Sequence, residues 1–439
     1  MNVRENNMKL RRALTMLLCS TILYVGPLYA QNVVTEWNDI SRITIVSPTK
    51  GNRGPGPSSV WFAYVHIAEY DAVNAIVHRF QPFYFNGSAP AGTSLDAAVI
   101  AAAHRVLVFY FPAFTVELDA DYNQSLDKIT DSPGSISSGI ATGEASAAAL
   151  INARAGDGLA ANVPYIPGHG PGVWQPTPPA FLPAAAPWVG QMRPFTLSSA
   201  SQFLPDGPTK LNSEEWEHDY KQTRILGDAN STVRTSSQTE IGLFWTENTS
   251  QQYARAFTYL AENYKLSVPD SVRLMAILWT GYADSIIGCF NAKYQYSFWR
   301  PVAAIPAGGG NSELTPFLNW TPLGITPNHP EYPAAHGCVT STIAHLIRGY
   351  FGTPRVRIVV DSLVFQDGIH THTFVDTRDL FREVFWARIY AGFHFHHSLV
   401  DGGTLGKEVA RQLLREHFRS LRDKDDEDDD DRNLDHDQH

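Results

Sequence analysis

Apolar residues recur at helical spacing along most of this chain of 439 residues. The stretch 60–77 is apolar at so many positions that it predicts a buried helix, in which His66 and Glu69 are hydrogen-bonded core groups. Its neighbours follow the same periodicity, often after a capping residue or before a proline. Further helices are predicted at 95–111, 114–129, 135–155, 213–227, 239–245, 251–265, 269–294, 334–351, 379–393 and 401–419, with a strand or extended link at 356–364.

Between residues 156 and 213 the helical pattern stops, because prolines and glycines recur too often for a long regular element. The same stretch carries aromatic residues such as Trp174, Trp188 and Phe195, which favour a packed excursion over a solvated linker. The sequence therefore predicts an all-α protein of packed helical bundles with one irregular Pro/Gly-rich excursion. We expect a single helical domain over residues 31–422.

The two ends of the chain differ from this domain. Residues 1–30 combine basic residues, an apolar run and a small residue at Ala30, a pattern typical of a secretory signal peptide and of a periplasmic or secreted protein. An uncleaved membrane anchor is the alternative. The apolar helix at 269–294 carries Arg273 and Asp284 and is too short to cross a bilayer with those charges, so no membrane span is expected after signal removal.

Ten acidic and two basic residues from Asp423 to His439 account for most of the net charge of −10. We expect this tail, residues 423–439, to be disordered, and no basic surface for nucleic acid is indicated. Cys289 and Cys338 remain after the signal and permit one disulfide, although two buried thiols are also compatible with the sequence. The oligomeric state does not follow from the sequence.

Three segments in the second half combine cations with histidines, and we interpret them as one anion-binding site within residues 284–410. Lys293 and Arg300 lie in the first segment (residues 293–301) and His336 in the second (residues 329–337). Arg388 and His394 lie in the third (residues 387–394). Lysine supplies a compact charge, arginine a planar fork of donors, and histidine a nucleophile or a proton-transfer group. This combination suits a tetrahedral oxyanion.

Two details strengthen this interpretation. A proline followed by Ala334 and Ala335 predicts a helix N-terminus whose backbone N–H groups face the ligand. Arg388 stands among apolar residues, so it needs a buried anion or a carboxylate, for which Glu383 or Asp379 could serve.

The order and spacing of these segments resemble the vanadium-dependent haloperoxidase and type 2 phosphatidic acid phosphatase superfamily. The shared pattern is Lys, six residues, Arg-Pro; then Pro, two small residues, His; then Arg, five residues, His. The likeness extends to residues 61–75, 95–111, 172–204 and 239–305, and is nearest to the soluble bacterial haloperoxidase-like branch.

The resemblance implies a role for each motif residue. The oxyanion-binding set would be Lys293, Arg300, Ala334, Ala335, Arg388 and His394. His394 would bond to the vanadium of vanadate, or attack phosphorus, and His336 would be the acid/base group opposite it. Lys293 would in addition polarise the bound peroxide.

Two positions depart from the family pattern. The usual Ser-Gly before the first histidine is Ala334-Ala335 here, so one hydroxyl donor to the oxyanion is missing and weaker vanadate binding is expected. In the phosphatase branch an acidic residue four positions after the second histidine orients it. That position is Ser398 in this chain, and the nearest downstream acid is Asp401.

The function implied by the resemblance is a vanadate-dependent haloperoxidase that oxidises halide with hydrogen peroxide to hypohalous acid. The alternatives are a cofactor-free periplasmic acid phosphatase, acting on a phosphate monoester through a phosphohistidine at His394, and a non-catalytic oxyanion-binding protein. A divalent metal site is a further alternative, built from His394, His396 and His397, to which His370 and His372 could be added. If they bind no metal, His370 and His372 are expected in a loop near the site.

Overall fold

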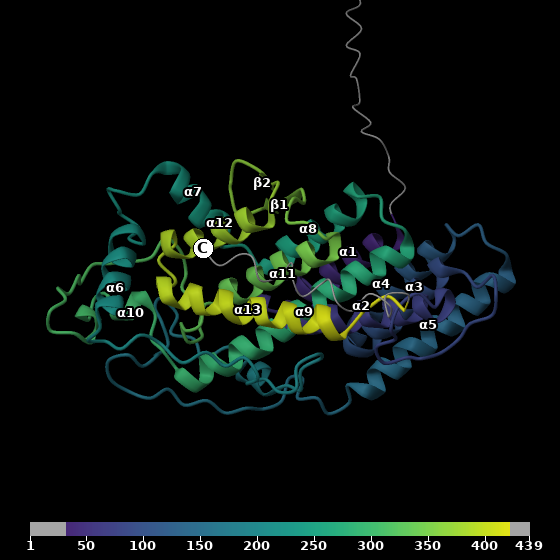
Figure 1. Ribbon diagram of the computed structural model, residues 1–439, viewed down its shortest axis with the longest axis horizontal. Coiled ribbons are helices and arrows are strands. Elements are labelled where there is room, and N and C mark those ends of the chain that lie inside the picture. The colour runs from purple at the N-terminus through teal and green to yellow at the C-terminus, as the bar shows by residue number, and fades with distance from the viewer. Residues whose placement is uncertain (1–31, 422–439) are drawn as a thin grey trace, which may run out of the picture. The chain divides into compact units, whose positions relative to one another are not determined.

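The computed structural model describes residues 32–421 and consists of helices with one two-stranded sheet (Figure 1). The predicted signal peptide and the acidic tail lie outside the described residues. The helices are α1 (Val33–Val46), α2 (Pro55–Val77), α3 (Leu95–Tyr110), α4 (Thr115–Leu126), α5 (Pro133–Ala153), α6 (Glu214–Leu226), α7 (Ser236–Phe244), α8 (Thr249–Asn263), α9 (Val268–Tyr296), α10 (Pro301–Ala304), α11 (Ala335–Phe351), α12 (Thr377–Tyr390) and α13 (His396–Glu416). Short 3₁₀ turns are η1 (Pro112–Phe114), η2 (Pro187–Gln191) and η3 (Gly308–Gly310), and the strands are β1 (Ile358–Ser362) and β2 (His370–Phe374).

The predicted all-α class is confirmed, and three local predictions are corrected. Helix α1 was not predicted, and the helix expected to reach residue 393 ends at Tyr390. The extended link at 356–364 contains β1, which pairs antiparallel with β2 so that Val360 lies opposite His372. His370 and His372 therefore lie on a strand of a hairpin and not in a loop.

Helix α9 carries the first motif and is buried along most of its length. It starts where the Ser267 side chain accepts a hydrogen bond from the Asp270 backbone, with a proline in the first turn, and it ends at Ser297, which has a φ of 49°. Its apolar side chains pack against α2 and α11. This burial holds Lys293, in the last turn, inside the protein.

The Pro/Gly-rich excursion is packed, as predicted, and contains only the turn η2 as regular structure. Asp284 in the middle of α9 accepts hydrogen bonds from the backbone N–H groups of Phe195 and Thr196, each at 2.7 Å. Trp174 and Phe195 are buried. The Asp284 side chain of α9 thus fixes a segment that has little regular backbone hydrogen bonding of its own.

The core of α2 contains the polar pair that the sequence placed there. His66 Nδ1 lies 2.7 Å from Glu69 Oε2, and His66 Nε2 lies 3.1 Å from Asn38 Oδ1. Within residues 32–421 no single helix is long and apolar enough to cross a membrane. The sharply bent pair Leu95–Tyr110 and Pro112–Leu126 does meet the test of length and composition when taken together.

Helices α11 and α13 lie side by side and cross α9 (Figure 1). Their close approach depends on glycines of α13, because a Cβ at Gly406 would stand 2.1 Å from the Cys338 carbonyl oxygen. Between α12 and α13 the chain turns sharply at Gly392, which has a φ of 74°. His394 lies in this turn, which fixes its side chain against α11 and the segment before it.

Substitution of Gly406 tests this packing. Gly406→Ala should lower the free energy of unfolding by about 1–3 kcal/mol, because the added methyl forces α11 and α13 apart. The matched control is Gly288→Ala in α9, where the nearest atom to an added Cβ lies at 3.6 Å. That variant should gain up to about 1 kcal/mol from helix propensity. Chemical denaturation followed by circular dichroism measures both, and equal effects would contradict the packing argument.

Candidate active site

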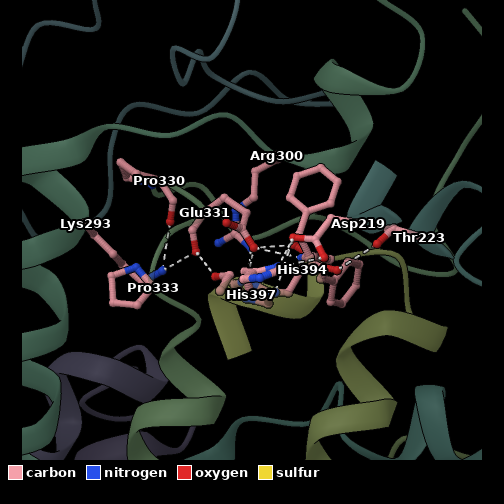
Figure 2. Close-up of polar contacts among 12 residues, drawn as sticks. Asp219, Thr223, Lys293, Arg300, Pro330, Glu331, Pro333, His394 and His397 are labelled. Atoms are coloured by element: carbon pink, nitrogen blue, oxygen red, sulfur yellow. Dashed lines mark hydrogen bonds and ion pairs between the residues drawn. The ribbon is translucent and has the colours of Figure 1, made fainter. Parts of the chain in front are cut away.

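His394 is buried at the centre of the three motifs, where its two ring nitrogens have different partners (Figure 2). Nδ1 lies 2.8 Å from Glu331 Oε1, and Nε2 lies 3.1 Å from an N–H group of Arg300. Because a guanidinium can only donate, Nε2 accepts and Nδ1 carries the proton. Burial, together with Arg300 and Lys293, lowers the pKa of His394 well below its usual value. The imidazole is therefore neutral, with an electron pair on Nε2.

Glu331 is the residue that orients His394, and the sequence interpretation did not assign it this role. Its Oε1 also accepts the backbone N–H of Phe395 at 3.0 Å, and burial raises the pKa of Glu331 to about 7 against the opposing effect of Arg300. Asp401, the nearest downstream acid, instead accepts a hydrogen bond from the Tyr332 hydroxyl at 2.6 Å. The available signal was that Glu331 is the one acidic residue in the three motif segments.

Lys293 is fully buried, and its Nζ donates to the carbonyl oxygens of Pro330 and Glu331, each at 2.9 Å. Burial lowers the pKa of Lys293 to about 8. A carbonyl acceptor satisfies an N–H group but brings no negative charge. The ammonium is thus positioned beside the segment that holds His394 without being neutralised by an ion pair.

Arg300 joins all three segments. Its Nε donates to the His329 carbonyl at 2.9 Å, and one terminal nitrogen donates to the Phe393 carbonyl at 2.9 Å as well as to His394. The other terminal nitrogen lies 3.0 Å from His329 Nδ1. Burial lowers the pKa of Arg300 to about 10. Nearly all of its N–H groups are engaged, so this arginine organises the site.

Arg388 has no carboxylate partner, which corrects the expectation that Glu383 or Asp379 would serve. It donates to the Trp245 carbonyl oxygen at 2.6 Å, while its Nε has no hydrogen-bond partner among the described residues. Glu383 accepts from the Trp245 indole, and Asp379 pairs with Arg382. Burial and Arg300 lower the pKa of Arg388 to about 9. A buried guanidinium in this state calls for an external anion.

His336 stands across the cavity from this group, in the first turn of α11. Its Nε2 lies 3.1 Å from the Thr249 hydroxyl. Burial and the nearby Arg388 lower the pKa of His336 well below its usual value, so the ring is neutral. Thr249 was not singled out from the sequence, because it is remote from all three motifs.

A small cavity of about 70 Å³ lies in front of these groups. Its polar lining comes from Thr249, Tyr282, His329, His336, Arg388 and His394. The site thus contains three histidines where the sequence interpretation counted two. Lys293 and Arg300 are not part of the lining and lie behind it, linked to His394 through Glu331 and through direct contact.

The start of α11 supplies backbone donors, but not as expected at Ala334. The Ala334 N–H donates to the Ser398 carbonyl at 2.9 Å, and its methyl group packs with Ile389 and Leu399. Ala335 lines the cavity and Ala334 does not. The first helical bond runs from Cys338 to Ala334, so the N–H groups of residues 335–337 have no helical acceptor.

The other histidines and the cysteines within residues 32–421 are not grouped as metal ligands. His397 lies 3.2 Å from Asp219 of α6, and His370 and His372 bind carboxylates of α7 and α12. Across residues 32–421, no three His, Cys, Asp or Glu side chains are placed to hold a metal ion. The two cysteines of this region are buried free thiols, which corrects the disulfide alternative.

The fold and the motif residues resemble those of vanadium haloperoxidases, and comparisons with known proteins confirm the predicted resemblance. Residues 273–423 match the family model described as the VCPO second helical-bundle domain. They include all three motifs.

Individual relatives agree with this class. The vanadium chloroperoxidase of Curvularia inaequalis is 27% identical over 199 residues, which cover 38% of this chain and only 32% of that relative. A bacterial vanadium-dependent iodoperoxidase has a similar structure, with a TM-score of 0.73 at 20% identity, covering 89% of this chain and 96% of that one. For a holo-type bacterial vanadium-dependent chloroperoxidase the TM-score is 0.70 at 16% identity, covering 88% and 97%.

Replacement of Glu331 tests its orienting role. Glu331→Gln keeps an acceptor but loses the charge that makes His394 a better electron-pair donor, so orthovanadate affinity should fall by about 10- to 100-fold. Asp401→Asn removes the acidic group that the sequence alone suggested and should leave affinity close to that of the unmodified protein. Calorimetric titration measures both. A larger loss in Asp401→Asn than in Glu331→Gln would contradict the assignment.

Proposed function

We propose that this protein is a vanadate-dependent haloperoxidase, which oxidises a halide with hydrogen peroxide to hypohalous acid. The observation that carries the proposal is an excess of buried positive charge. Lys293, Arg300 and Arg388 surround His394, and among the described residues none of the three forms an ion pair within 4.0 Å. A dianionic or monoanionic oxyanion would offset this charge, which the single carboxylate of Glu331 does not.

The residues fit vanadate. His394 Nε2 carries an electron pair that accepts from Arg300 and would bond to the metal once this N–H group turned to a vanadate oxygen. Arg388 has an unpartnered Nε, and the start of α11 offers backbone N–H groups to the oxygens. Vanadate, when bound, supplies an electrophilic centre at which hydrogen peroxide becomes reactive toward halide. Lys293 and Arg300 hold positive charge behind this centre, where negative charge must be stabilised.

His336 is suited to move the protons. Its neutral ring can accept a proton from a small reactant in the cavity, and the resulting charge is opposed by Arg388, so the proton is readily released again. The Thr249 hydroxyl, 3.1 Å from Nε2, fixes the ring orientation. The family resemblance implies the same roles for His336, Arg388 and His394, whereas for Lys293 and Arg300 it implies direct contact with the oxyanion, which their place behind the cavity lining does not give.

The main alternative, an acid phosphatase, would use the same residues with His394 as the nucleophile. A cavity of about 70 Å³ suits a small inorganic oxyanion, which both activities require, and the likeness to a vanadium chloroperoxidase supports the first proposal. A non-catalytic oxyanion-binding protein would show neither activity.

The test is a pair of assays on purified protein. After loading with orthovanadate, bromination or iodination of a phenol dye in the presence of peroxide should be observed, and hydrolysis of an aryl phosphate should be absent. Hydrolysis without halogenation would replace the proposal by the phosphatase. Binding of vanadate with neither reaction would leave only an oxyanion-binding protein.

His394→Ala should abolish the halogenation and leave the helical circular dichroism spectrum unchanged, because this residue would bond to the metal. The matched control is His397→Ala, three residues later, whose ring is held by Asp219 outside the cavity. That variant should retain activity. Activity in His394→Ala equal to that of the unmodified protein would remove the assignment of the whole site.

A further inference from the structure

The hairpin β1–β2 carries a histidine whose two ring nitrogens both face carboxylates. His372 Nδ1 lies 2.7 Å from Glu383 of α12, and His372 Nε2 lies 3.3 Å from Glu240 of α7. A neutral imidazole has only one N–H group, so both contacts are hydrogen bonds only when the ring is the doubly protonated cation. The ring also stacks on Phe244 at a centroid distance of 3.8 Å.

The carboxylate of Glu383 connects this histidine to the site. Glu383 Oε1 accepts the indole N–H of Trp245 at 3.0 Å. The backbone carbonyl of the same tryptophan accepts from Arg388 at 2.6 Å. One fully buried residue thus receives the hairpin contact through its side chain and holds Arg388 of the site through its main chain.

The link between α7 and α8, residues 245–248, is held from several sides. Glu247 pairs with Arg255 of α8 at 2.9 Å and accepts the backbone N–H of Leu363, just after β1, at 2.9 Å. The Trp245 indole is held by Glu383 of α12. Glu383 is therefore the contact that acts on the Trp245 side chain, while Glu247 holds the rest of the link.

We propose that His372 is a positioning residue for the oxyanion site: through Glu383 and Trp245 it fixes the carbonyl that orients Arg388. The effect on oxyanion binding rests on the proposed function, whereas the link from His372 to Trp245 does not. His372 contacts neither the cavity nor any residue that would bond to vanadium. The three motif segments do not include this histidine.

The charge on His372 makes its link to Trp245 through Glu383 depend on pH. Burial opposes that charge, but the hydrogen bond to Glu383 and the charges of Glu383 and Glu240 raise the pKa of His372 above its usual value. The other charged groups of the cluster are His370 and Asp367, which bind each other, while His370 also binds Glu240. Below this raised pKa both carboxylate contacts are hydrogen bonds. As the pH rises through it the ring keeps only one N–H group, so one of the two contacts is lost and the link is weakened.

The first experiment compares two histidines of the same strand. His372→Ala should weaken binding of orthovanadate by about tenfold, as for other residues that orient ligand-binding groups. His370→Ala removes an imidazole from the same cluster, but His370 has no contact with Glu383. This variant should therefore change the affinity for orthovanadate much less. Equal losses in the two variants would show a general effect of charge or of hairpin stability and would overturn the proposal.

The second experiment needs no oxyanion. In protein with ¹⁵N-labelled tryptophan, the indole signal of Trp245, assigned through Trp245→Phe, should titrate with a midpoint above about pH 6.5, the usual value for histidine. The titration should vanish in His372→Ala and persist in His370→Ala. Identical titration in unmodified protein and His372→Ala would refute the link, even if vanadate binds.

A conservative variant separates positioning from mere packing. Glu383→Gln retains an acceptor for the Trp245 indole and should keep most of the vanadate affinity, whereas Glu383→Ala should lose as much as His372→Ala. Greater loss in Glu383→Gln than in Glu383→Ala would contradict the proposal. If the unmodified protein bound no orthovanadate, the proposed function would fail, and the indole titration would still decide whether His372 controls Trp245.

Discussion

Main-chain carbonyl groups hold the cations of this site. The charge of the site and its attraction for an anion depend on the use of carbonyl groups in place of carboxylates. Lys293 donates to two carbonyl oxygens, Arg300 to two, and Arg388 to one. Carbonyl dipoles fix direction but add no net charge, so the three buried cations keep a positive charge that exceeds the one carboxylate of Glu331. Side-chain carboxylates in the same places would have neutralised this charge and left little affinity for an anion.

Such a site imposes demands on the surrounding protein. Burial lowers the pKa of each cation, to about 8 for Lys293, about 9 for Arg388 and about 10 for Arg300. Their mutual repulsion opposes folding unless rigid elements hold them together. Helix α9 supplies Lys293, the end of α12 supplies Arg388, and the turn before α13 supplies His394. Close packing of α11 on α13 then brings the opposite wall into place.

The sequence was sufficient to predict the helical class and the three motif segments, because helical periodicity and residue order are local properties. It was insufficient for contacts that only tertiary packing creates. Glu331 and His394 are 63 positions apart, and their pairing depends on how the 329–333 segment docks. Glu383 was considered as a partner of Arg388 because the two are close along α12, yet its carboxylate faces Trp245.

The second strand and the third histidine were missed for related reasons. The strand β2 reads His-Thr-His-Thr-Phe, which has almost no apolar alternation, so only its pairing with β1 identifies it. His329 stands at the edge of the second motif, and nothing in its local sequence shows that its ring faces the cavity. Ala334 and Ala335 are neighbours in the same motif, but the turn into α11 sends one into the core and the other toward the ligand.

The carbonyl acceptors also bear on how far such a protein can diverge. At positions 245, 329, 330, 331 and 393 the atom that contacts a cation belongs to the backbone, which every amino acid provides. Side chains there are free to change as long as the chain keeps its path, apart from those with a second duty such as Trp245 and Glu331. Such contacts need only the path of the backbone, and the fold that sets this path is shared with solved haloperoxidases at only 16–20% identity.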